Sequence, residues 1–136
     1  GNGPILNEIK LRYSKKNIEF LGEIENSKVL KEIRKARAVI TATKLLEGQP
    51  MLLCEASING VPSIFPKFGG ISEFFPIGYK FSYNQFDYLD LDKKFNLLED
   101  KSLLTKNGQN NRKFISSYLD EKKLIDHFEE YLGTNE

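Results

Sequence analysis

Cysteine and histidine are almost absent from this sequence of 136 residues, which holds one of each. Cys54 alone excludes an intramolecular disulfide framework and a cysteine-based zinc cluster. With His127 as the only histidine, neither a histidine-rich metal site nor a Ser-His-Asp triad is expected. Long apolar runs are also lacking. None approaches the roughly 18–20 residues of a membrane helix, and residues 1–10 lack the layout of a signal peptide.

The composition is that of one soluble globular domain, with 40% apolar and 29% charged residues. Residues 1–46 carry ten Lys/Arg against five Asp/Glu, whereas residues 47–136 carry ten against fourteen. A basic first third suits phosphate, nucleic acid or an anionic membrane, or is simply the solvated face of two helices. Aromatic residues do not alternate with these cations, so no nucleic-acid partner is expected. We expect a cytoplasmic protein, and association with the inner membrane face is a hypothesis.

Hydrophobic periodicity predicts helices that alternate with short strands. The expected helices cover residues 4–16, 26–36, 50–58, 71–75, 86–98, 99–118 and 120–132. The expected strands are Ile18–Leu21, Ala38–Ala42, Val61–Phe65 and Tyr79–Tyr83. This order predicts an α/β fold with a Rossmann-like parallel sheet flanked by helices. We expect one partial domain over 1–136, with the site in residues 1–83 and a mainly helical tail over 84–136.

The segments that follow the predicted strands are the expected binding site, because ligands of such sheets bind at the carboxyl ends of the strands. Glu47 lies just before a predicted helix, and Glu55 lies inside it. The helix rises about 7–8 Å from Pro50 to Glu55, so both carboxylates can face one crevice. Helix N–H groups near Glu47 would suit a ligand with hydroxyls at both ends and phosphate between them. The alternative is that the helix dipole alone favours the carboxylates and that Gly69-Gly70 only makes a turn.

Several motifs occur in the order and spacing of one enzyme family. They are Gly1-Asn2-Gly3-Pro4, Asn17–Gly22, Val39–Ala42, Glu47–Ala56 followed by Gly60-Val61-Pro62, and Gly69–Glu73. Together they resemble the C-terminal, donor-binding domain of group 1 (family 4-like) retaining glycosyltransferases, which have the two-domain GT-B fold. The signature of that family is two glutamates separated by seven residues, which Glu47 and Glu55 match here.

The resemblance implies a role for each matching residue. Donor-sugar contacts would fall to Glu47, Gly48 and Gln49, and the ribose diol would be bound by Glu55. Diphosphate contacts would come from Gly1, Gly3 and the backbone N–H groups of Met51 and Leu52. The base would lie beside Gly22, Glu23 and Ile24. Further candidates are Gly69, Gly70 and Glu73. The family implies no metal and no cofactor in this domain, because the nucleotide sugar is itself the donor substrate.

The implied reaction transfers a glycosyl group from a UDP- or GDP-sugar to an acceptor hydroxyl with retention, in polysaccharide or glycolipid synthesis. The family's Arg and Lys for the diphosphate, and its N-terminal acceptor-binding domain, would precede Gly1. We therefore expect a truncated half-enzyme that is inactive alone and needs that domain as its partner. Two alternatives stay open: a sugar-nucleotide epimerase of the same architecture, and a non-catalytic module that binds nucleotide sugar or a partner subunit.

Overall fold

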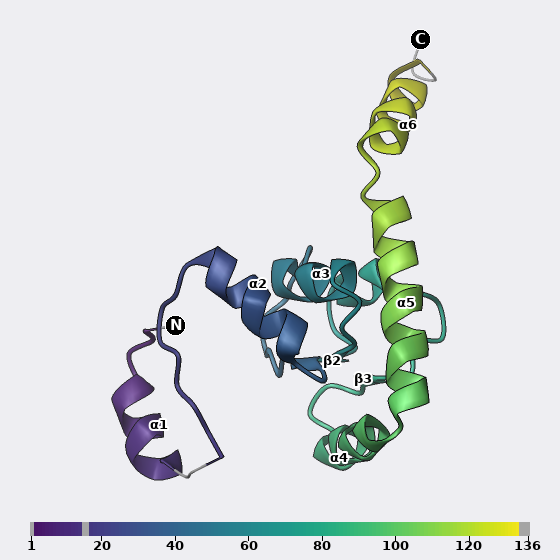
Figure 1. Cartoon of the computed structure of the whole chain (residues 1–136). Helices are drawn as coiled ribbons and strands as arrows, with labels where there is room; N and C mark the ends of the chain where they lie inside the picture. Colours follow the sequence, from purple (N-terminus) through teal and green to yellow (C-terminus); the bar gives the residue numbers. More distant parts are fainter. Residues whose placement is uncertain (1, 15–16, 134–136) are drawn as a thin grey trace. The chain divides into compact units, whose positions relative to one another are not determined.

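The computed structural model describes residues 2–14 and 17–133 of the chain (Figure 1). It divides into two compact units, Gly1–Glu32 and Ile33–Glu136. Helix α2, Asn26–Lys35, spans the division and begins where the sequence predicts. The predicted α/β fold with a parallel sheet is confirmed in the second unit. Among the described residues, no helix has the length and apolar character needed to cross a bilayer.

The first unit contains α1, Leu6–Tyr13, followed by an irregular segment. Helix α1 confirms the helix predicted near the start of the chain, although none of its side chains is buried. The predicted end near Lys16 lies outside the described residues. The predicted strand at Ile18–Leu21 is wrong, because these residues form no strand and both end residues are more than 40% exposed. Alternating side chains do not make a strand unless a second strand supplies the hydrogen-bonding ladder.

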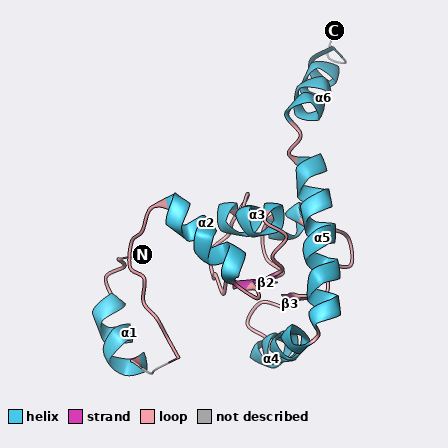
Figure 2. Ribbon diagram, viewed as in Figure 1, coloured by secondary structure: helices cyan, strands magenta, loops and turns pink. Residues whose placement is uncertain are grey.

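The second unit is built on three short parallel strands in the order β1-β2-β3. They are β1, Val39–Ile40; β2, Ser63–Pro66; and β3, Ser82–Tyr83. Figure 2 labels β2 and β3, which lie among the helices and loops of this unit. Val39 pairs with Ser63 and Phe65 pairs with Ser82, so β2 lies in the centre and all four of its residues are buried.

The outer strands are shorter than the sequence predicts. Only Val39–Ile40 of the predicted Ala38–Ala42 strand forms β1, and Ile40 is 42% exposed rather than buried. Because β1 is an edge strand, only its β2 side is covered by a neighbour in the sheet. The predicted Tyr79–Tyr83 strand is likewise reduced to its last two residues.

Helix α3, Met51–Ile58, confirms the helix predicted between β1 and β2. Pro50 precedes its first turn, and Gly60 follows its end with φ of +72°. Helix α3 lies beside α5, Lys101–Tyr118 (Figure 1). Their approach is close enough that a Cβ on Gly108 of α5 would overlap the Gly60 carbonyl oxygen. Glycine at 108 is therefore a packing requirement, whereas Gly60 is favoured by its positive φ and would have room for a Cβ.

The remaining helices fall where periodicity predicts them. They are the 3₁₀ turns η1, Ile71–Phe74, and η2, Leu97–Glu99, with α4, Tyr88–Asn96, and α6, Glu121–Gly133. Aspartates begin two of the long helices. Asp87 accepts the Asp90 N–H at 2.9 Å before α4, and Asp100 accepts the Leu103 N–H at 2.9 Å before α5. The predicted helical tail is confirmed.

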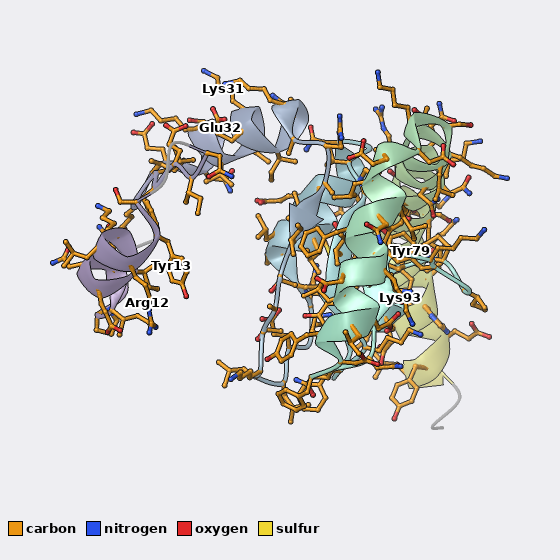
Figure 3. The ribbon with its side chains drawn as sticks, turned by 90° about the horizontal axis from the view of Figure 1, so that it is seen from below. Arg12, Tyr13, Lys31, Glu32, Tyr79 and Lys93 are labelled. Carbon is orange, nitrogen blue, oxygen red and sulfur yellow. The ribbon has the colours of Figure 1, made fainter. Side chains whose placement is uncertain are left out.

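Tyr79 lies between the two clusters of core side chains of the second unit, beside α5 (Figure 3). The clusters are Leu53, Phe65, Ile71 and Phe75, and Ile64, Phe81, Tyr83 and Leu104. The Tyr79 hydroxyl accepts the Ser63 N–H and donates to the Ser63 carbonyl oxygen, both at 2.8 Å. Burial raises the pKa of Tyr79 to about 12, against the opposing effects of Ser63 and the Asn111 amide. These two hydrogen bonds link β2 to the loop before β3.

Candidate functional site

The loop between β1 and α3 packs against the glycine pair that follows β2. The Gly70 N–H donates to the Glu47 carbonyl oxygen at 2.9 Å. Gly69 has φ of +62°, and a Cβ built on it would lie 2.8 Å from the Glu47 carbonyl oxygen and 3.2 Å from the Glu47 nitrogen. The glycine pair therefore provides the space that the Glu47 backbone occupies. Of the strand-following segments, the structure brings together Glu47-Gly48 and Gly69-Gly70.

A small cavity of about 110 Å³ lies beside this loop, where α3 begins. It is lined by Thr41, Glu47, Pro50, Met51, Leu52 and Leu53. The first N–H groups of a helix have no partner within the helix, so the start of α3 offers donors here. Among the expected site residues, the cavity collects Glu47, Met51 and Leu52, whereas Gly48 and Gln49 lie on the exposed part of the loop.

Thr41 and Leu53 are site residues that the sequence reading missed. Thr41 directly follows β1, and its carbonyl oxygen lies 3.5 Å from the Tyr83 hydroxyl. The sequence places Thr41 inside the predicted Ala38–Ala42 strand, so it gave no signal that Thr41 lies at the carboxyl end of β1. Leu53 is 1% exposed and closes the inner wall, for which its apolar character gave no functional signal.

Glu55 lies on α3 with a half-buried side chain, and it is not part of the cavity wall. It follows Met51 by four residues and Leu52 by three, so these three side chains share one face of the helix. Of the two carboxylates that were expected to face one crevice, Glu47 lines this cavity and Glu55 does not. Glu47 lies before α3, and Glu55 lies about one turn inside the helix.

Gln49 has a contact that the sequence reading did not foresee. Its side chain hydrogen-bonds the buried Cys54 thiol. Burial raises the pKa of Cys54, the Gln49 hydrogen bond opposes that rise, and the Glu55 charge adds to it. A buried thiol held in its protonated form is a poor nucleophile, so Cys54 is a space-filling side chain of α3.

The segments at residues 1–3 and 22–24, which were expected to border the phosphate and the base, lie in the first unit. The Asn2 amide donates to the Glu23 carboxylate at 3.3 Å. Gly22 has φ of +67°, and a Cβ on it would lie 3.3 Å from the Asn2 side-chain oxygen. The motif around Gly3 and the Gly22-Glu23-Ile24 segment are therefore neighbours within that unit. Gly1 lies outside the described residues.

Glu73 is exposed in η1, where its N–H donates to the Gly70 carbonyl oxygen at 3.1 Å. Its backbone continues the glycine turn, but its side chain does not line the cavity beside Glu47. Within residues 2–14 and 17–133, no three His, Cys, Asp or Glu side chains gather closely enough to hold a metal ion. Comparison of the chain with protein-family models, curated proteins and solved structures gives no match.

Proposed function

We propose that this chain binds the nucleotide-sugar donor of a retaining glycosyltransferase and supplies the donor half of its active site. The observation that carries the proposal is the packing of the Glu47 loop on Gly69-Gly70 at the start of α3. That contact places one carboxylate, a set of helix N–H groups and a cavity at the carboxyl end of a parallel sheet. Such an edge is where α/β proteins bind nucleotides.

The chemistry of each group suits a different part of the donor. Glu47 borders the cavity and can accept hydrogen bonds from sugar hydroxyls, as a carboxylate offers several acceptor positions. The N–H groups at the start of α3 suit the diphosphate, because a helix N-terminus carries partial positive charge. Glu55, one turn further, suits the two ribose hydroxyls. A full transfer reaction would also need an acceptor site and stabilisation of the departing diphosphate.

Calorimetry with UDP and with 2′-deoxy-UDP at millimolar concentration tests the assignment of Glu55. The wild type should bind UDP about tenfold more tightly, because a carboxylate–hydroxyl hydrogen bond contributes about 1.5–3 kcal/mol. Glu55→Gln should remove most of that preference, and Glu47→Gln should retain it. GDP and 2′-deoxy-GDP form a second pair of ligands, because the proposal does not specify the nucleotide base.

Glu129→Gln is the matched control, because Glu129 is an exposed helical glutamate of α6. It should bind as the wild type does. An equal preference for UDP over its deoxy form in wild type and Glu55→Gln would refute the ribose assignment. Absence of any nucleotide binding by the folded wild type would refute the proposed function itself.

A further inference from the structure

An open groove with a basic lining lies at the amino ends of the strands, whereas the Glu47 cavity lies at their carboxyl ends. It encloses about 480 Å³ between the end of α2, the turn after α3 and the start of α5. Four cationic side chains line it: Arg34, Lys35, Arg37 and Lys101. Arg37 precedes β1 and Val61-Pro62 precede β2, so the groove borders the amino ends of the strands. It is therefore a different site from that at Glu47, which follows β1.

The lining of the groove combines cationic side chains with small or apolar residues. Arg34 is held by its Nε, which donates to the Asn59 side-chain oxygen at 2.8 Å. Its planar guanidinium still presents two terminal nitrogens, a geometry that matches phosphate oxygens. The small or apolar lining residues are Ala36, Gly60, Val61, Pro62 and Leu104.

Glu99 and Asp100 are carboxylates close to lining residues of the groove. Glu99 reaches Arg37 at 3.3 Å, but the two side chains are 82% and 53% exposed, so their attraction is weak. Asp100 is engaged as the N-cap of α5 through the Leu103 N–H. Neither carboxylate lines the groove itself, and no Asp or Glu is among its described lining residues, so this lining is rich in positive charge. That imbalance favours an anion over a zwitterion or a cation.

We propose that this groove binds a phosphate group, carried either by a small soluble metabolite or by a lipid headgroup. Arg37 and Lys101 contribute two of its cationic side chains from different elements, one ahead of β1 and one on α5. Phosphate accepts bidentate hydrogen bonds from guanidinium and a point-charge contact from ammonium. The groove is a second binding site, and it does not depend on the nucleotide-sugar proposal.

The test follows backbone amide shifts of the 136-residue chain by NMR during titration with inorganic pyrophosphate. Amides of Gly60, Val61 and Thr105 should shift, since these residues line the groove. Arg37→Gln/Lys101→Gln should weaken binding at least about tenfold, because two charged phosphate contacts are lost. The matched control is Arg112→Gln/Lys113→Gln, which removes two exposed charges from α5 outside the groove. It should change the affinity less than about twofold.

A second arm identifies the source of the phosphate. Co-sedimentation with phosphatidylglycerol vesicles, with phosphatidylcholine vesicles as reference, is measured for the same three proteins. Binding to anionic vesicles that only the Arg37→Gln/Lys101→Gln variant loses assigns the phosphate to lipid. Pyrophosphate binding without vesicle binding assigns it to a soluble ligand.

Equal losses in both double variants, or no binding in either arm, would overturn the proposal. Shifts confined to residues 48–53 would also overturn it, because they would assign pyrophosphate to the Glu47 site. Dispersed amide spectra for both variants show that their folds are intact, so that a loss of binding reports on charge.

Discussion

Replacing Gly69 with alanine should destabilise the second unit and distort the loop that holds Glu47. Two effects act at this position. A residue with a Cβ at φ of +62° loses roughly 1–2 kcal/mol relative to glycine. The new Cβ would also lie 2.8 Å from the Glu47 carbonyl oxygen, which belongs to the backbone and cannot rotate away. The loop must therefore shift, and the hydrogen bond from the Gly70 N–H is lost or lengthened.

Gly78 provides a matched control for that substitution. It has φ of +77°, yet a Cβ built on it would meet no atom within 4 Å. Gly78→Ala should cost about 1–2 kcal/mol from backbone strain alone, whereas Gly69→Ala should cost about 2–4 kcal/mol. Alanine also reduces the entropy of the unfolded chain, but that effect is the same in both variants and cancels in the comparison.

Urea unfolding followed by circular dichroism measures both free energies of unfolding. UDP calorimetry on the same proteins should show weaker binding for Gly69→Ala and unchanged binding for Gly78→Ala. Equal destabilisation by the two substitutions would refute the packing of Glu47 on the glycine pair. This stability comparison holds whether or not the chain binds a nucleotide, so it separates the architecture of the site from its proposed ligand.

Two further predictions concern the core of the second unit. Gly108→Ala should lower the free energy of unfolding, measured with urea, by about 2–3 kcal/mol, because its Cβ would overlap the Gly60 carbonyl oxygen. Gly133→Ala is the control: its Cβ would have open space around it, so the free energy of unfolding should change by less than about 1 kcal/mol. Tyr79, with its pKa raised to about 12, stabilises the fold fully below pH 10 and loses that contribution of about 2–3 kcal/mol as the pH rises from 10 to 12. Tyr79→Phe should flatten this part of the stability–pH curve measured by urea unfolding, and the exposed Tyr131→Phe should not; equal slopes in all three proteins would contradict the assignment.

The elements that local chemistry specifies are those that the sequence predicts well. Pro50 and Asn59-Gly60 define both ends of α3, because proline favours a first turn and glycine accepts the positive φ after the last. The aspartates at 87 and 100 begin α4 and α5 through side-chain caps within three residues. These contacts join residues only three or four positions apart, so the periodicity and the capping residues of the sequence predict them.

Strand extent and side-chain partnership depend instead on residues far along the chain. Ile18–Leu21 has the alternation of a strand but forms none, and Ile40 is exposed because β1 lies at the edge of the sheet. The Tyr79 hydroxyl bonds the backbone of Ser63, a pairing with no local signal. The basic groove joins Arg37 and Lys101 only because β1, β2 and α5 meet in the fold.

The charge around the Glu47 cavity limits what it can bind without help. Its described lining contains one carboxylate and no cation, and Glu55 adds a second negative charge on the same helix. The diphosphate of a nucleotide sugar would then rely on the partial positive charge of the α3 N-terminus, which contributes only about 0.3–1 kcal/mol when exposed. A neutral sugar meets no such penalty, because its hydroxyls donate to these carboxylates. Tight donor binding therefore requires cations from outside this cavity. The cations of the basic groove cannot bind this diphosphate, because they lie at the amino ends of the strands and the cavity lies at the carboxyl ends.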